Sequence, residues 1–200
     1  GTEATPTMIY DTNHMTPGYN TTKSISSNRF DGVDTYINLG SGETLLNHTY
    51  STISLWFKKD GLTGEPQIIF GHRAFGNSPG NILYIYFDNN DNILDVNLAE
   101  IQQSFGTVSL DTWYNVILVI DRNVSIYQRY LNGIAIGSPV AFTFEDTWEN
   151  VILGNFKIGG GLIFNGSIDD VMIWNRSLDE NEVKFLYQSY ADKYNLTTTA

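Results

Sequence analysis

Short apolar runs recur along the chain every 8 to 14 residues, and clusters of Asn, Asp, Gly and Ser separate them. Several runs alternate apolar and polar positions, which is typical of strands with one buried face, and none shows a helical period. Short strands at this spacing predict an all-β fold built as a two-sheet antiparallel sandwich. The predicted strands are residues 35–39, 52–58, 67–71, 82–87, 93–98, 113–120, 124–131, 151–153 and 168–174.

The connections between these runs carry residues suited to tight turns. Asn132-Gly133 is the preferred pair for a two-residue type I′ hairpin. Residues 88–92, which read DNNDN, tolerate left-handed backbone and predict a hairpin between the strands on either side. Their spacing resembles the start of an EF-hand, but Ile93 and Ala99 stand where that loop needs glycine and glutamate.

One helix is predicted, directly after the last strand. Ser177 and Glu180 have the spacing of a capping box, and Asp179 suits the positive first turn of a helix. An apolar stripe would pack the helix against the sandwich, and it consists of Val183, Leu186 and Tyr187.

Composition restricts the class of protein further. The 200 residues, 42% hydrophobic and 14% aromatic, fit a single domain with a two-layer core. A balance of 22 acids to 11 bases gives a net charge of −11, which repels nucleic acids and anionic membrane surfaces. There is no cysteine, so disulfides and thiolate chemistry are excluded.

Both ends of the chain are rich in threonine and resemble linkers. We therefore expect an N-terminal segment and first strand over residues 1–27, a sandwich domain over 28–190 and a linker end over 191–200 of a longer chain.

The sequence contains more N-x-Ser/Thr acceptor motifs than chance predicts, which favours a glycoprotein outside the cell. Their asparagines are Asn20, Asn47, Asn123, Asn165, Asn175 and Asn195.

Four motifs follow one another in a fixed order. They are RFDGVDTYI at 29–37, STISLWFKKDG at 51–61, DTWYNVILVIDRN followed by YLNG between 111 and 133, and GSIDDVMIWNRSLDENEVKFLY at 166–187. Together they resemble the laminin G-like, concanavalin A-like lectin/glucanase superfamily, in its cysteine-free branch. The resemblance implies a jelly-roll sandwich with one short C-terminal helix.

The segment ILGNFKIGGG before the last strand also resembles pentraxins, distantly. That family has an acidic, amide-rich calcium loop at this point, whereas this chain has Asn155, Phe156, Lys157 and Ile158. We therefore do not carry the pentraxin calcium site over to this chain.

The doubled acid Asp169-Asp170 raises the question of catalysis. Adjacent strand residues point to opposite faces, so these carboxylates are not expected to act as a pair on one substrate. Glycosidases of this fold use alternating acids on one strand, and no such run is present. The three histidines, His14, His48 and His72, are scattered and lack a Ser or Cys nucleophile motif.

A structural calcium ion is the one cofactor that the sequence favours. Asp31 and Asp34 would meet Asp169 or Asp170 if the first and last strands are neighbours, as the resemblance implies. The alternative is that these carboxylates accept backbone hydrogen bonds or pair with Arg29.

Ligand binding is predicted on two surfaces. Alternation along NILYIYF places Tyr84 and Tyr86 on one face of a strand, and Trp148 lies in a loop. The long, glycine-rich connection over 71–81 contributes polar side chains. The candidate ligand residues are Arg73, Asn77, Asn81, Tyr84, Tyr86 and Trp148. The alternative is that they are solvated turns and half-buried tyrosines, while Trp56, Trp113 and Trp174 belong to the core.

Taken together, these features favour a noncatalytic recognition module of a secreted or surface protein, which binds a glycan or a protein partner. The alternative is a structural or assembly module of a viral or cell-surface fibre that binds no sugar. The sequence leaves the oligomeric state open.

Overall fold

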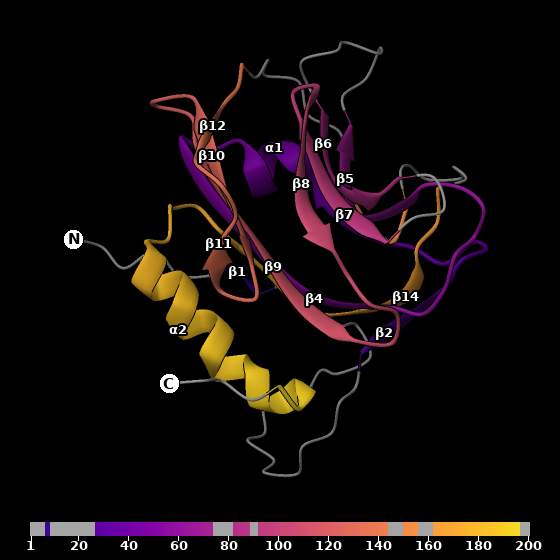
Figure 1. Ribbon diagram of the computed structural model, residues 1–200. Coiled ribbons are helices and arrows are strands. Elements are labelled where there is room, and N and C mark those ends of the chain that lie inside the picture. Colours follow the sequence, from indigo (N-terminus) through magenta and orange to yellow (C-terminus); the bar gives the residue numbers. More distant parts are fainter. Residues whose placement is uncertain are drawn as a thin grey trace.

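The computed structural model describes residues 7–8, 27–73, 82–88, 92–143, 150–155 and 162–196, and for Thr7, Met8 and Arg73 it describes the backbone alone. Within these ranges two antiparallel sheets face each other as a sandwich, and one helix lies outside them (Figure 1). The predicted fold class, an all-β two-sheet jelly roll with a short C-terminal helix, is confirmed.

The larger sheet has eight described strands in the order β1-β14-β4-β9-β10-β11, with β2 also pairing with β14 and β12 with β10. Its long central strands are almost entirely buried because both of their faces are covered. The strands are β1 Thr7–Met8, β2 Asn28–Asp31, β4 Tyr50–Lys59, β9 Trp113–Asp121, β10 Ile126–Leu131, β11 Ile134–Ala135, β12 Val140–Ala141 and β14 Asn165–Trp174.

The smaller sheet has six described strands in the order β3-β13-β5-β6-β7-β8. The strands are β3 Ile37–Ser41, β5 Gln67–Arg73, β6 Ile82–Phe87, β7 Ile93–Leu98, β8 Ile101–Thr107 and β13 Asn150–Leu153. The hairpin between β6 and β7 pairs Phe87 with Leu94, as the DNNDN turn predicts. All nine strands predicted from the sequence are present, and the described strands β1, β2, β8, β11 and β12 are additional.

The main core lies between the two sheets. Alternate residues of β4 and β6, such as Leu55, Phe57, Leu83 and Ile85, point inward and are at most 1% exposed. Helix α1, Gly42–Leu46, closes one end of the sandwich, because Leu46 is buried in this core.

A second apolar layer lies on the outer face of the larger sheet, under helix α2, Glu180–Ala191, and the 3-10 turn η2, Asp192–Tyr194 (Figure 1). The predicted apolar stripe is confirmed, since Val183 is fully buried and Leu186 packs beside it. Trp56 is buried as predicted, but it lies under the helix: its ring stacks on Tyr187 at 5.6 Å and on Tyr194 at 4.2 Å between centroids.

The start of this helix differs from the prediction. Asp179 is the N-cap, and its side chain accepts a hydrogen bond from the Glu182 backbone N–H at 2.9 Å. The Glu182 carboxylate in turn accepts from the Asp179 N–H at 2.9 Å. The capping box predicted at Ser177 and Glu180 is therefore wrong by two residues, since Asp179 and Glu182 have the same spacing and the chain extends through Leu178 before the helix begins.

Candidate functional site

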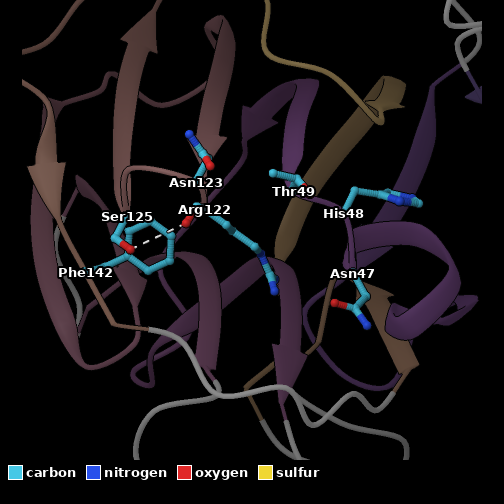
Figure 2. A pocket seen from close by; sticks show the side chains of 7 residues that line it. All are labelled: Asn47, His48, Thr49, Arg122, Asn123, Ser125 and Phe142. Carbon is cyan, nitrogen blue, oxygen red and sulfur yellow. Dashed lines mark hydrogen bonds between the residues drawn. The ribbon is translucent and has the colours of Figure 1, made fainter.

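A pocket of about 370 Å³ lies at the end of the sandwich where α1 meets the larger sheet. It is built from three short segments that follow α1, β9 and β12 (Figure 2). The described residues that line it are Asn47, His48, Thr49, Arg122, Asn123, Ser125 and Phe142.

The turn between β9 and β10 holds one wall of the pocket. Asp121 ends β9, and its carboxylate accepts hydrogen bonds from the N–H groups of Asn123 at 2.9 Å and Val124 at 3.3 Å. Such an Asp turn fixes the backbone locally. Ser125 completes the turn with a positive φ of 55°, and its carbonyl accepts from the Phe142 N–H at 3.0 Å. The wall is therefore held by its own sequence and does not depend on a ligand.

Arg122 connects this turn to the segment that follows α1. Its backbone N–H donates to the Thr49 carbonyl at 2.9 Å, and its side chain extends into the middle of the group, between Phe142 and Asn47 (Figure 2). His72 of β5 is fully buried nearby: burial, and then the positive charge of Arg122, lower the pKa of His72 to about 4. At neutral pH the imidazole of His72 is therefore uncharged, and Arg122 carries the positive charge.

The lining side chains are suited to binding a polar molecule. Asn47 and Asn123 offer amides, Thr49 and Ser125 offer hydroxyls, and Arg122 offers a guanidinium group. The Nε2 atom of His48 lies 3.2 Å from the Thr44 carbonyl, and the ring points away from the centre of the pocket (Figure 2). Among the described lining residues there is no carboxylate, so they do not provide the acid pair of a glycosidase.

The tyrosines predicted to bind ligand lie elsewhere, on the outer face of the smaller sheet. Tyr84 stands opposite Asn97, and Tyr86 stands opposite Asp95, whose carboxylate accepts a hydrogen bond from Gln102 at 2.8 Å. Tyr84 is only 8% exposed and Tyr86 is half-buried, so little ring surface is open to a sugar.

The other predicted ligand residues stay predictions. Asn77, Asn81 and Trp148 lie outside the described residues, and Arg73 ends β5 but is described by its backbone alone.

The acids proposed for calcium are only partly brought together. The first and last strands are neighbours as expected, but Asp31 pairs with Asn165, four residues along β14 from Asp169. The Asp31 carboxylate accepts hydrogen bonds from the N–H groups of Val33, Asp34 and Thr35, which lower its pKa to about 2. Asp34 is exposed in the same turn.

Asp169 and Asp170 are oriented differently from the prediction. A β-bulge interrupts the pairing of β14 with β4 between Asp169 and Met172, and Asp170 has a positive φ of 44°. Both carboxylates consequently meet the same ammonium group, since Lys193 Nζ lies 2.8 Å from Oδ2 of each. The prediction that they point to opposite faces is wrong, because it assumed a regular strand.

This cluster has perturbed protonation equilibria. Burial raises the pKa of Asp169, and the negative charge of Asp170 raises it further. Burial lowers the pKa of Lys193, but its hydrogen bonds to the two carboxylates outweigh burial and raise the pKa overall. The Tyr194 hydroxyl donates to Asp170 at 2.6 Å. The two acids therefore fasten η2 to the sheet.

Within the part of the chain that the structure describes, no three Asp, Glu or His side chains come together as metal ligands would. The calcium ion thus stays a prediction from the sequence. In the same ranges, no helix is long and apolar enough to span a membrane.

The described residues form a two-sheet β-sandwich of the concanavalin A-like type. A profile of the concanavalin A-like lectin/glucanases superfamily matches residues 31–184, which is most of the chain. The chain belongs to this family, as the four sequence motifs indicate. No curated protein matches the sequence in a direct search.

Solved structures with the same fold are distant in sequence. The Trypanosoma rangeli sialidase in complex with 2,3-difluorosialic acid superposes with a TM-score of 0.68 at 18% identity, over 82% of this chain and 28% of that one. A heptameric SAP-like pentraxin from Limulus polyphemus gives 0.58 at 17% identity, over 80% of both chains. Domain 4 of AbnA, a GH43 extracellular arabinanase from Geobacillus stearothermophilus in complex with arabinotriose, gives 0.61 at 22% identity, over 81% of this chain and 76% of that domain. The chain thus spans about a quarter of the sialidases, and the likeness shows the fold alone.

Sequence reasoning missed the pocket, although one signal for it was present. Its lining contains the Asn and the hydroxyl residue of two of the acceptor motifs, Asn47 to Thr49 and Asn123 to Ser125. These motifs are 76 residues apart in the chain, and the pairing of β4 with β9 brings them together.

Proposed function

We propose that this chain is a noncatalytic carbohydrate-binding module of a secreted or surface protein, and that it binds the sugar in the pocket around Arg122. The observation that carries the proposal is the pocket itself. It is preformed, and amide, hydroxyl and guanidinium groups from the two segments that follow α1 and β9 converge on it. These are the groups that bind sugar hydroxyls in proteins.

Membership of a lectin/glucanase superfamily supports the choice of ligand class. So does the arabinanase domain of the same fold, whose structure contains arabinotriose. Binding at one shallow polar site would be weak, and repeated copies on a surface or parent chain would strengthen it.

A glycan array tests the proposal, with the protein displayed as an oligomer to raise avidity. The double variant R122Q/N123A should lose the signals that the unchanged protein gives. The matched control is Y86F on the outer face of the smaller sheet, which should keep them. Signals that survive in R122Q/N123A and vanish in Y86F would move the site to that face, and an array without any signal would contradict sugar binding.

The assembly role is the second candidate, and one surface favours it. Phe185 on α2 is 72% exposed and Ile134 of β11 is 68% exposed. Both belong to the helix-bearing face, because Gly133 packs against the Tyr187 ring. Light scattering that finds a stable oligomer, dissociated by F185S, would favour this role.

Calcium binding is a separate proposal that rests on the sequence. A bound ion must stabilise the fold by mass action, so calcium should raise the melting temperature and excess EDTA should lower it. Identical melting curves with added calcium and with excess EDTA would contradict calcium binding.

A further inference from the structure

We propose that Asn47 and Asn123 are attachment sites for N-linked glycans in the folded protein, and that Asn165, which has the same acceptor motif, is not. The inference goes beyond the proposed function and does not rest on it, because a covalently attached glycan needs no sugar-binding pocket. Asn20 lies outside the described residues, as does Thr197, which completes the motif of Asn195.

The two attachment sites lie side by side at one end of the sandwich. The Arg122 N–H extends the pairing of β9 with β4 to the Thr49 carbonyl at 2.9 Å. Figure 2 shows Asn47 and Asn123 on opposite sides of the Arg122 side chain. Both asparagines are exposed, and so are Thr49 and Ser125, the hydroxyl residues of the two motifs. A glycan on either asparagine therefore has solvent beside it.

Neither side-chain amide is needed to hold the local backbone. Asn47 follows helix α1 as its C-cap residue, outside the strands. The turn that contains Asn123 uses its backbone N–H, which donates to Asp121 at 2.9 Å. Modification of the side-chain nitrogen leaves this hydrogen bond in place, so the fold is compatible with a glycan at both positions.

Attachment is a group transfer to the Nδ2 atom of the asparagine. A bond forms between Nδ2 and the anomeric carbon of N-acetylglucosamine, and the bond from that carbon to the diphosphate of a polyprenyl-diphosphate oligosaccharide breaks. The lipid diphosphate leaves with the bonding electron pair, and Nδ2 gives up one proton to solvent. The product carries a bulky sugar directly on the side chain, so the folded protein has glycans only where Nδ2 has room for one.

Asn165 lacks this room. It lies in β14, where it pairs with Asp31 of β2, and its Oδ1 atom accepts a hydrogen bond from Arg29 at 3.3 Å. Its Nδ2 atom lies so close to Gly61 that a Cβ on this glycine would stand 3.1 Å away. Ser167, the hydroxyl residue of the motif, is only 6% exposed. A sugar ring on Nδ2 would have to displace the Gly61 segment, and a chain modified there would not reach this fold.

Glycans at Asn47 and Asn123 would also cover the pocket that these residues line. An N-linked glycan is bulky and hydrated, so two of them at one end of the sandwich would keep other molecules away from that end. Binding of a free sugar in the pocket would then be a property of the unmodified chain.

Mass spectrometry of the secreted protein tests the inference. The chain is secreted from a eukaryotic cell line behind an added signal peptide, and the soluble folded fraction is isolated and digested. Peptide N-glycosidase in heavy-oxygen water then converts each glycosylated asparagine into labelled aspartate. A parallel digest without the glycosidase corrects for spontaneous deamidation, to which Asn165-Gly166 is prone.

Asn47 and Asn123 should be labelled and Asn165 should not. Asn175 is exposed in the bend after β14 and shows whether the cells modify this chain at a site away from the pocket. Asn47 and Asn123 without label would overturn the inference, whatever the state of Asn175. Label at Asn165 to the same extent as at Asn47 and Asn123 would overturn it as well.

Substitutions of the hydroxyl residues assign each glycan to its site. T49A and S125A keep the asparagine but destroy the acceptor motif, so each should lower the apparent mass in a denaturing gel by one glycan. T49S keeps a hydroxyl and should leave the mass unchanged, as should N165Q. An unchanged mass in T49A or S125A, or the loss of a glycan in N165Q, would contradict the assignment.

The glycan array separates this inference from the proposed function. Protein from bacteria without a glycosylation system and the T49A/S125A variant from the secreting cells should give the same sugar signals, and the glycosylated protein should give weaker ones. If the bacterial protein binds no sugar, the proposed function falls, whereas the attachment sites are decided by the mass spectra alone. Equal signals from glycosylated and unmodified protein would contradict the covering of the pocket.

Discussion

The ammonium nitrogen of Lys193 lies 2.8 Å from Oδ2 of Asp170, and this contact fastens the C-terminal turn η2 to strand β14. Asp169 shares the same ammonium group at the same distance. One cation thus compensates two carboxylates that are neighbours in the chain.

Removing Lys193 should destabilise the fold, because K193M leaves two half-buried carboxylates facing each other. We expect a loss of about 1 to 3 kcal/mol, less than for a fully buried pair, since the Lys193 side chain is 27% exposed. Urea unfolding measures it. In a D169N/D170N background the same substitution should cost much less, and an equal cost in both backgrounds would show that the ion pairs do not stabilise the fold.

Alkaline pH should weaken the same region. Burial, and then the charges of Asp170 and Asp169, raise the pKa of Tyr194 far above its usual value of 10, and the pKa of Lys193 is also raised. Above about pH 10 the unfolded chain releases these protons while the folded chain keeps them. Their contribution is therefore complete below about pH 10 and is lost as the pH rises.

Urea midpoints between pH 8 and 11.5 check this expectation. Y194F should show a shallower decline than the unchanged protein, because it cannot ionise at that position. The control is Y36F, since Tyr36 is an exposed tyrosine, and its decline should match the unchanged protein. Equal declines in Y194F and Y36F would contradict the assignment to Tyr194.

Gly166 is expected to tolerate no side chain. A Cβ there would lie 2.2 Å from the Lys58 carbonyl oxygen and 2.5 Å from the Phe164 ring, both in the packed interior. G166A should therefore cost at least about 3 kcal/mol. At Gly64 the φ of +87° is the only obstacle, since no atom lies within 4 Å, so G64A should cost about 1 kcal/mol. Thermal unfolding of G166A and G64A measures the loss of stability in each, and similar losses in the two variants would contradict the close packing at Gly166.

The helix cap gives a fourth prediction. D179A removes the acceptor for the Glu182 N–H and should cost about 1 kcal/mol. S177A should change the free energy of unfolding by less than about 0.5 kcal/mol, because Ser177 Oγ has no hydrogen-bond partner within the described ranges. A larger loss of stability in S177A than in D179A would instead support Ser177 as the N-cap, as expected from the sequence.

The strands could be predicted from the sequence because alternation records which face of each strand is buried. Strand β8 was missed because IQQSFGT is an edge strand with exposed Gln102 and Ser104, so its pattern is polar. The bulge at Asp169 and Asp170 was missed for a different reason. A positive φ at an aspartate depends on tertiary contacts, here with Lys193, and leaves no periodic signal.

The pocket could not be predicted because its residues follow no common period, and the two acceptor motifs among them do not show by themselves that they lie side by side. His48, Arg122 and Phe142 come from connections after three different elements, and only the strand order brings them to one end of the sandwich. The prediction that Tyr84 lies on the face of its strand opposite to the core is correct, since Leu83 and Ile85 face the core. The pattern gave no information on how much of that outer face is covered.

The position of β14 bears on how the chain folds during synthesis. This late strand is inserted between β4 on one side and β1 and β2 on the other, so the larger sheet has a gap until residues 165–174 have left the ribosome. Until then β4 exposes an unpaired, strongly apolar edge, which is prone to associate with other chains. Completion of the sheet is thus delayed until β14 has been synthesised, and truncations before Asn165 should yield aggregating chains, not smaller folded domains.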